Sequence, residues 1–564
     1  MGSARAAGAD TVYRNGVVIT VDDVHPRAQA VAVKDGRIVG VGSDAAVTRR
    51  WGHGARIVDL QGKVMVPGFV DGHSHIGDLV GFWRLPDLSP PPVGTTRAIA
   101  DIQRVLRERI ATAHPAPGEM VFGVGYDDSL LAERRHPSRA ELDAVSAVQP
   151  ICVAHVSGHL ARCNTPALAR LGLTRDTPDP KGGRLGRDAN GELNGALEEQ
   201  AVFLALAAAP RMDAEDARRA FGEIQTYYAS LGYTTAQDGQ TSSPVTLGLL
   251  LDAQRDGTLE IDVASYPKWT IIDDLVAKQG IRIGGPYERH LKFAGVKISA
   301  DGSPQGKTAY LTQPYVHPPA GEKPDYRGFP TVPADELSRL YATFMGRGWQ
   351  VQTHCNGDAC IDMLLAAVRH AYAVNPQARA TRPVVVHSQV TRPDQVKAYA
   401  ELGIFPTFFA EHTYYWGDWH RTETLGPDRA AYISPTADAL KAGVRFSLHT
   451  DAPVVPPDPM HAMWSAVNRV TRSGYALGPG QRISPMDALR AVTIWPAWQH
   501  FDEASRGSIT PGKLADLVVL DADPLTVEPM AIRDIKVLAT IKEGREIYRR
   551  GETPVARVPF AGTP

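Results

Sequence analysis

Cysteine is scarce in this sequence. Its 564 residues include four cysteines, at positions 152, 163, 355 and 360, and none of them form a Cys-x-x-Cys pair. So few cysteines in so long a chain do not indicate a disulfide framework. We expect all four to be reduced thiols.

Long hydrophobic runs are also lacking. No apolar stretch reaches the roughly 18 to 20 residues that a membrane-spanning helix needs. The first ten residues are rich in Ala and Gly and lack the basic and apolar stretches of a signal peptide. We therefore expect a cytoplasmic protein that does not enter a membrane.

There is no excess of charge of one sign. Sixty Lys and Arg stand against 62 Asp and Glu, which gives a net charge of -2. Because no basic field would attract nucleic acid or an anionic membrane, the expected partner is a small-molecule substrate. A homodimer is left open as the assembly.

Internal repeats and low-complexity tracts are absent, and the remaining composition is that of a globular enzyme, with 43% hydrophobic and 22% charged residues. Both ends of the chain alternate apolar and polar residues between turn signals, as in AVAVKDGRIVGVG and GSITPGKLADLVVLD. Such alternation is typical of β-strands. Residues 1–63 and 506–564 are therefore predicted to form one β-sandwich from both termini.

The middle of the chain, residues 64–505, alternates short apolar runs with helix-length patterns, which indicates βα units and a parallel sheet. Eight runs are candidate strands: 64–71, 233–238, 261–266, 293–299, 349–354, 383–388, 405–409 and 445–451. This predicts an α/β fold, a (β/α)8 TIM-like barrel. The long segment 76–230 after the first strand is too long for a loop and is predicted to be an inserted subdomain.

The strongest local signal is a pair of histidines at the end of the first candidate strand. In PGFVDGHSH, His73 and His75 are separated by one residue. On an extended backbone such side chains point the same way, so both imidazoles can reach one metal ion. Two exposed loop histidines are the alternative interpretation.

Other polar residues end other candidate strands, on the face where barrel enzymes place their active sites. They are Lys297, His354, His387 and Asp451. Each taken singly could be a core or loop residue. Their occurrence in this strand order favours one shared site, and His449, two residues before Asp451, is expected to support it.

Together, PGFVDGHSH, the single histidines at strand ends, SLHTDAP and GSITPGKLADLVVLD resemble the amidohydrolase superfamily over nearly the whole chain. Within it, HVSGHLARCN, GVKISADGSPQGKTAYL and HCNGDACIDMLL are similar to the YtcJ-like branch, which includes N-substituted formamide deformylases. The resemblance implies a metal-dependent hydrolase that cleaves a C–N bond of a small molecule, such as an N-substituted formamide or N-acyl amine.

The resemblance also implies roles for the strand-end residues. His73 and His75 would bind one divalent metal ion, with Zn²⁺ the expected metal, and His354 and His387 a second one. Lys297 would bridge two ions if its amine is carboxylated by CO₂, with a salt bridge to Asp301 or another acid as the alternative. Asp451, a further ligand, would be the catalytic acid/base that takes a proton from metal-activated water and passes it to the leaving amine.

Four residues are candidate substrate contacts. His159 lies in the HVSGH segment of the predicted insertion, where His155, Ser157 and His159 alternate. His412, Tyr414 and Trp416 follow the seventh strand. The resemblance implies that His412 could bind the carbonyl oxygen, whereas Tyr414 and Trp416 belong to an aromatic cluster that could accommodate an aromatic or alkyl group. For all four, a purely structural role is the alternative.

Two other functions remain open. A deaminase or cyclic-imide hydrolase could use the same scaffold, although deaminases of the superfamily commonly lack the lysine and carry a glutamate near the strand-five histidine, which HCNGD does not offer. A non-catalytic binding or regulatory barrel would not need all the predicted metal ligands and Asp451, so their presence in the sequence argues against it. Metal content and turnover of a substrate panel separate the three.

Overall fold

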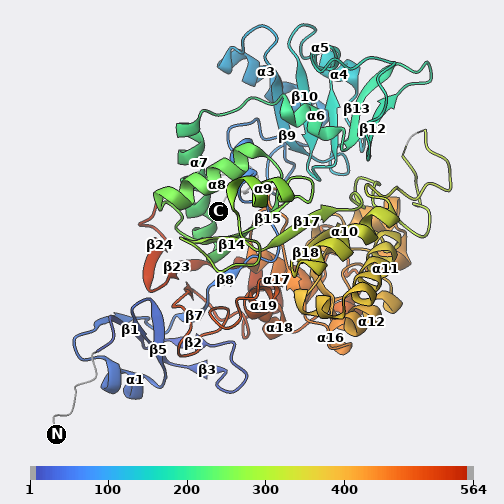
Figure 1. Cartoon of the computed structure of the whole chain (residues 1–564). Helices are drawn as coiled ribbons and strands as arrows, with labels where there is room; N and C mark the ends of the chain where they lie inside the picture. The colour runs from blue at the N-terminus through green and yellow to red at the C-terminus, as the bar shows by residue number, and fades with distance from the viewer. Residues whose placement is uncertain (1–7, 320, 556–564) are drawn as a thin grey trace.

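The computed structural model describes residues 8–319 and 321–555 (Figure 1). The N-terminal strands lie beside the C-terminal ones, a set of parallel strands with helices occupies the middle, and a separate sheet stands at the far end. The outer ends of the predicted terminal segments, residues 1–7 and 556–564, lie outside the described residues. No helix of the described ranges is both long and apolar enough to cross a membrane.

The two ends of the chain are joined in one sheet. The strands near the termini are β1 (Thr11–Arg14), β2 (Val17–Ile19), β3 (Arg27–Ala28), β4 (Ala30–Lys34), β5 (Arg37–Gly42), β6 (Arg56–Asp59), β7 (Val64–Pro67), β22 (Leu517–Leu520), β23 (Val537–Lys542) and β24 (Arg545–Arg549). A six-stranded sheet has the order β24-β23-β22-β7-β2-β3, and a four-stranded sheet has the order β5-β4-β1-β6. Buried Val33, Met65 and Ile541, from β4, β7 and β23, belong to one apolar core, so this core needs both ends of the chain.

The middle of the chain contains parallel strands in the order of a TIM-like barrel. They are β8 (Phe69–Val70), β14 (Tyr233–Thr241), β15 (Asp262–Pro267), β16 (Leu291–Phe293), β17 (Gly295–Ser299), β18 (Gln350–Cys355), β19 (Val384–His387), β20 (Phe405–Phe408) and β21 (Ser447–Leu448). Two arcs, β8-β14-β15-β16 and β17-β18-β19-β20-β21, follow the chain order. β16 and β17 are separated only at residue 294, and a parallel bridge joins Lys268 to Lys297. Each of the candidate runs therefore contains a strand, and the α/β fold class is confirmed.

The first candidate run, 64–71, divides into two strands. Val64–Pro67 pairs with β2 and β22, and only Phe69–Val70 pairs with β14. The break falls at Gly68, where an added Cβ would lie 2.3 Å from Thr234 Oγ1. The sequence pattern could not reveal this break because both pieces are fully apolar and buried.

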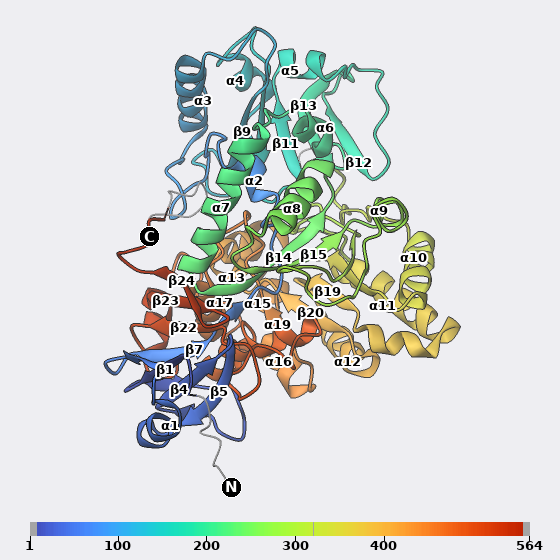
Figure 2. The same cartoon turned by 60° about the vertical axis from the view of Figure 1, so that its left-hand side comes forward.

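Helices cover the outside of the parallel strands (Figure 2). The longer ones are α7 (Ala214–Ser230), α8 (Pro244–Asp256), α10 (Ala334–Gly346), α11 (Asp358–Val374), α12 (Pro393–Leu402) and α17 (Pro459–Asn468). In α11 the buried residues Ile361, Leu364, Leu365 and Val368 recur at helical spacing, so one stripe faces the strands. α12 begins with Pro393 and ends at Gly403 in the left-handed conformation, the usual start and stop signals of a helix.

The segment after β8 builds its own sheet. Its elements are α2 (Leu79–Phe82), α3 (Ile99–Ala113), β9 (Val121–Tyr126), α4 (Arg139–Asp143), β10 (Ile151–His155), β11 (Leu160–Cys163), α5 (Thr165–Arg170), β12 (Gly183–Arg187), β13 (Leu193–Glu199) and α6 (Val202–Ala207). The strand order is β12-β13-β11-β10-β9. This sheet, at the top in Figures 1 and 2, contributes one side of the cavity described below.

The cysteines are not reduced thiols, so that prediction is wrong. Cys152 is bonded to Cys163, and Cys355 to Cys360. The first pair lies directly opposite in the antiparallel strands β10 and β11, and the second connects the end of β18 to the first turn of α11. Strand register and a tight turn bring these residues together, and a search for Cys-x-x-Cys spacing cannot detect either. Cysteine usage therefore gives no argument for a reducing compartment.

A buried ionic cluster connects the barrel to the shared sheet. Asp262 of β15 is 2% exposed; its carboxylate pairs with Arg506, with Lys542 Nζ at 2.8 Å and with His290 Nδ1 at 2.7 Å. We expect Asp262→Asn to lower the free energy of unfolding by about 3 kcal/mol, because two buried cations, Arg506 and Lys542, lose a counter-charge. Urea denaturation followed by circular dichroism would measure this. Asp256→Asn, which affects an exposed surface pair, is the control; equal midpoints for both variants would contradict the expectation.

Candidate metal centre

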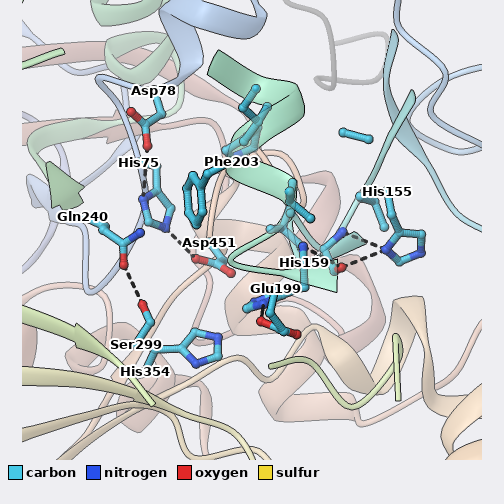
Figure 3. Close-up of a pocket in the computed structure, with 18 of the residues that line it drawn as sticks. His75, Asp78, His155, His159, Glu199, Phe203, Gln240, Ser299, His354 and Asp451 are labelled. Carbon is cyan, nitrogen blue, oxygen red and sulfur yellow. Dashed lines mark hydrogen bonds and ion pairs between the residues drawn. The ribbon is translucent and has the colours of Figure 1, made fainter. Parts of the chain in front are cut away.

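A cavity opens between the barrel strands and the inserted sheet (Figure 3). Its non-atom space is about 1150 Å³, a figure that includes open solvent at the mouth. The predicted metal-site residues that line it are His75, Lys297, His354, His387 and Asp451.

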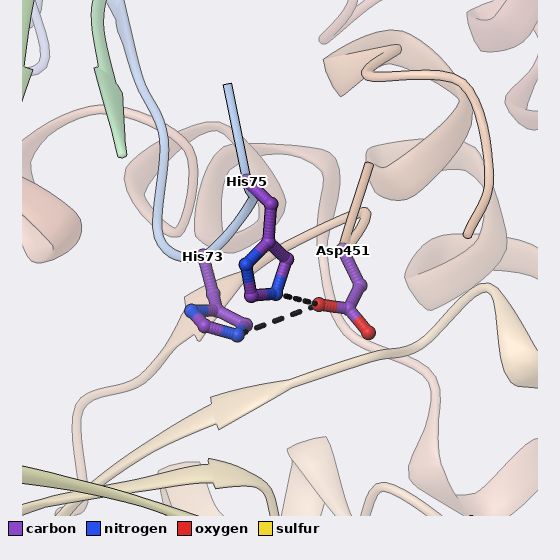
Figure 4. A group of neighbouring side chains, drawn as sticks. All are labelled: His73, His75 and Asp451. Atoms are coloured by element: carbon purple, nitrogen blue, oxygen red, sulfur yellow. Dashed lines mark ion pairs between the residues drawn. The ribbon is translucent and has the colours of Figure 1, made fainter. Parts of the chain in front are cut away.

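His73 and His75 converge on one oxygen of Asp451 (Figure 4). The Nε2 atoms of the two histidines each lie 3.4 Å from Asp451 Oδ1. That oxygen is buried and accepts no hydrogen bond from any described residue. Both imidazoles thus point to one place, as the sequence predicted, although they lie at a bend after β8 and not on an extended strand.

The side of the His73 ring that faces away from Asp451 is held by Gln237. Its Nδ1 lies 2.5 Å from Gln237 Oε1, an acceptor, so Nδ1 carries the hydrogen and Nε2 keeps its lone pair toward Asp451. Gly239 leaves room for the ring, since an added Cβ would lie 2.2 Å from His73 Cε1. Residues of β14 therefore position this imidazole, although the motif that predicted it directly follows β8.

His354 and His387 lie on the other side of Asp451. Their ring centroids are 4.5 Å apart, and His387 Nε2 is 4.0 Å from Asp451 Oδ2. Asp301 Oδ1 lies 3.3 Å from His354 Nδ1. One ligand atom each from His387, His449 and Asp451 lies within 4.8 Å of the others, so His449, expected only as a support, belongs to the cluster.

Two of these residues have an unusual backbone. His387 has φ +70° and Asp451 has φ +56°, in the left-handed region that residues other than glycine seldom occupy. Such conformations cluster at functional sites, where the surrounding structure holds them. They aim both side chains at the same point from the ends of β19 and β21.

Lys297 reaches the same point from β17. Its Nζ lies 3.0 Å from His73 Nε2, and the residue is 1% exposed. The alternative of a salt bridge with Asp301 is not observed, because no carboxylate in the described part of the chain lies within 4.0 Å of this amine. Burial lowers the pKa of the Lys297 amine to about 7, so much of it is uncharged at neutral pH.

The donor set fits a divalent metal ion. Imidazole nitrogens and a carboxylate oxygen are the ligands that Zn²⁺ binds. Burial lowers the pKa of His73 and His387 well below its usual value, so both rings are neutral and offer lone pairs. Both ring nitrogens of His449 and Oδ1 of Asp451 are buried without a hydrogen-bond partner among the described residues, which a bound ion would remedy.

Of the predicted substrate contacts, only His159 lines the cavity. His412 pairs with His420 at 3.0 Å, Tyr414 packs on Trp464, and Trp416 donates to Asp127 at 2.7 Å. The last three do not line this cavity, and Trp416 lines a second, smaller pocket. Their role as substrate contacts stays a prediction.

Sequence reasoning missed Asp78, Glu199 and Phe203, which also line the cavity. Asp78 Oδ2 lies 3.9 Å from His75 Nδ1; its place three residues after His75 was a usable signal. Glu199 and Phe203 come from the end of β13 and from α6. No local pattern marks them, since only the folding of the insertion brings them over the barrel.

Comparison with known proteins identifies the family. A profile described as the amidohydrolase family matches residues 56–548. The chain belongs to the amidohydrolase family. This amidohydrolase is 29% identical to the N-substituted formamide deformylase of Arthrobacter pascens, over 96% of this chain and 98% of that protein. It is 25% identical to the Bacillus subtilis protein YtcJ, over 96% and 99% of the two chains.

A solved structure described as an uncharacterized metal-dependent hydrolase from Pyrococcus horikoshii shares the fold of this amidohydrolase. The TM-score is 0.72 at 24% identity, over 92% of this chain and 99% of that one. The TIM-barrel-like α/β fold, the family and the enzyme class, a hydrolase acting on C–N bonds, are as the sequence predicted.

Proposed function

We propose that this amidohydrolase uses a divalent metal ion to cleave the amide bond of an N-substituted formamide or a related N-acyl amine. The observation that carries the proposal is the convergence of His73 and His75 on Asp451 Oδ1, an oxygen that accepts no hydrogen bond from a described residue, beside the cavity. The name of the Arthrobacter pascens relative supports the substrate class.

His73 and His75 would hold one ion, and His354 and His387 a second, with Zn²⁺ the expected metal. Carboxylated Lys297 would bridge the two; its partly uncharged, buried amine beside His73 supports this. When bound, the metal supplies a Lewis acid that polarises the amide carbonyl and makes water more acidic.

Asp451 is then the proton carrier. Its carboxylate faces the cavity and takes a proton from the attacking water, and it returns that proton to the nitrogen of the leaving amine. The opposite wall, from the insertion, is mixed: it has polar side chains, among them His159 and Glu199, and an apolar part that includes Val156, Phe203 and Leu206. The apolar part favours an apolar substituent on the nitrogen.

We also propose the three-part division of the chain made above: a β-sandwich from residues 1–63 and 506–564, a barrel over 64–505 and an inserted subdomain at about 76–230. The sheet shared by β7 and β22 and the separate sheet of β9 to β13 support it. The homodimer left open above gains no support from the described residues.

A substrate panel tests the function. With Zn²⁺ restored, we expect turnover of formanilide and of an N-acetylated amine, no turnover of a cyclic imide or an amino-substituted heterocycle, and loss of activity on chelation. Steady-state kinetics and elemental analysis of the same preparations provide the data. Activity confined to the imide or the heterocycle would replace the proposal by the alternative hydrolase or deaminase, and metal-free protein with full activity would overturn it.

A further inference from the structure

His449 is a buried histidine whose ring lacks a hydrogen-bond partner. It directly follows β21 and is 1% exposed. Neither of its ring nitrogens forms a hydrogen bond with a residue of the described ranges. Burying a polar group costs free energy unless a partner compensates for the lost water, so two unpaired nitrogens on one ring need an explanation.

Other buried histidines of this chain do not share this feature. His420 and His500 are both fully buried, and each nitrogen of the two rings has a polar partner atom within 3.0 Å. Where a histidine is buried for packing, the fold thus supplies partners for it. Packing alone does not account for His449.

The His449 ring lies among the candidate metal ligands. Its centroid is 5.0 Å from that of His387 and 5.4 Å from that of His73. One ligand atom each from His387, His449 and Asp451 lies within 4.8 Å of the others. Tetrahedral ligands at about 2.1 Å from a zinc ion are roughly 3.5 Å apart, so small side-chain rotations would bring the three atoms to one ion.

The two oxygens of Asp451 face different histidines. Oδ1 is approached by Nε2 of His73 and of His75, each at 3.4 Å (Figure 4), whereas Oδ2 is the oxygen that lies 4.0 Å from His387 Nε2. One carboxylate can thus serve two ions. The second ion would lie on the side of His387, whose ring is next to that of His449.

We infer that His449 is a third histidine ligand of the second metal ion, beside His354 and His387. An imidazole nitrogen is a common zinc ligand, and the ion would supply the partner that this ring lacks. Three imidazoles are also a ligand set that zinc takes in catalytic sites. The inference rests on the proposed function for the presence of the metal but not for the identity of the substrate.

A crystal structure of the zinc-loaded full-length enzyme, with anomalous scattering at the zinc edge, tests the ligand directly. We expect one zinc ion at about 2.0 to 2.1 Å from a ring nitrogen of His449 and from one of His387. A zinc ion on His354 and His387 with both His449 nitrogens more than about 3 Å away would overturn the inference, since such a distance is too long for a zinc–nitrogen bond. Zinc at His73 and His75 alone would overturn it as well.

The variant His449→Phe tests the ligand in solution. It keeps an aromatic ring against Phe409, whose centroid is 4.8 Å away, but removes both nitrogens. In competition with a chromophoric chelator, the variant should bind its second equivalent of zinc at least about tenfold more weakly than the wild type. Zinc affinities equal to those of the wild type would contradict the assignment.

His420→Phe is the matched control. It makes the same substitution at a buried histidine whose nitrogens pair with His412 and Thr424. This variant should be less stable in urea and keep both zinc affinities. An equal loss of zinc affinity in the control would assign the effect to packing and count against the inference.

Cobalt(II) in place of zinc gives a spectroscopic readout. The d–d absorption of the second cobalt equivalent should change in His449→Phe and stay as in the wild type in His420→Phe; unchanged spectra in both would argue against a bond to His449. All these measurements report on the metal and none on turnover. Zinc bound to His449 in an enzyme that hydrolyses no amide would refute the proposed substrate class and leave the ligand standing. An amide hydrolase whose His449 lies away from both ions would do the reverse.

Discussion

Asp451→Asn should fold and keep most of its metal while losing roughly 10²- to 10⁴-fold in kcat, the usual contribution of a positioned acid/base. Asparagine retains an oxygen that can face His73 and His75, as Asp451 Oδ1 does now. It cannot accept a proton from water or return one to the leaving amine. Steady-state kinetics on formanilide together with elemental analysis would measure the two effects separately.

The matched control is Asp458→Asn. Asp458 is also a partly buried aspartate of the same region, but it caps α17 by accepting from Met460 N; asparagine caps equally well. This variant should keep the kcat of the wild type. Turnover by Asp451→Asn close to that of the control would rule out the acid/base role.

Lys297→Ala should lose at least one equivalent of metal and roughly 10²-fold or more in activity, because a bridging ligand between two ions disappears. Added bicarbonate should not restore activity, whereas a short carboxylic acid should restore part of it by standing in for the missing carbamate. Metal content and turnover are measured with and without acetate. Reconstitution of the wild type in CO₂-free buffer should be slow for the same reason.

The control here is Lys278→Ala, which removes an exposed lysine of α9 (Ile272–Gln279) that pairs with Asp274. It should match the wild type in metal and turnover. A fully active enzyme with an unmodified Lys297 and a single metal would refute the bridge. Asp451 alone would then orient the water.

The parts of the site predictable from sequence are those set by local geometry. His73 and His75 were predicted to face one point from their two-residue spacing, and they do so from a bend that follows β8. His354 and His387 were predicted because each lies at the end of an apolar run, and parallel strands bring such ends to one face; Lys297 lies in the middle of β17. Reading apolar runs as strands also predicted the strands themselves. It did not predict the break at Gly68, which depends on the contact with Thr234.

The parts that were missed depend on contacts distant in the sequence. Glu199 meets His159 across 40 residues of the insertion, and its left-handed backbone leaves no mark in the sequence. Trp416 resembled a substrate contact, yet its indole donates to Asp127, 289 residues away. The pairing of Cys152 with Cys163 follows from the register of β10 and β11. Composition and periodicity carry no information on any of these distances.

The two disulfides also bear on how this enzyme is made and handled. Cys152–Cys163 ties together the hairpin whose tip presents His159, and Cys355–Cys360 closes the turn that directly follows His354. Each disulfide thus restricts the conformations of a segment that carries a cavity-lining histidine. A preparation from a host that keeps thiols reduced, or one stored with a thiol reductant, lacks both disulfides. Its hydrophobic core is the same, but the two segments next to the active site are less restricted. Specific activities of this enzyme are therefore comparable only between preparations of the same thiol state.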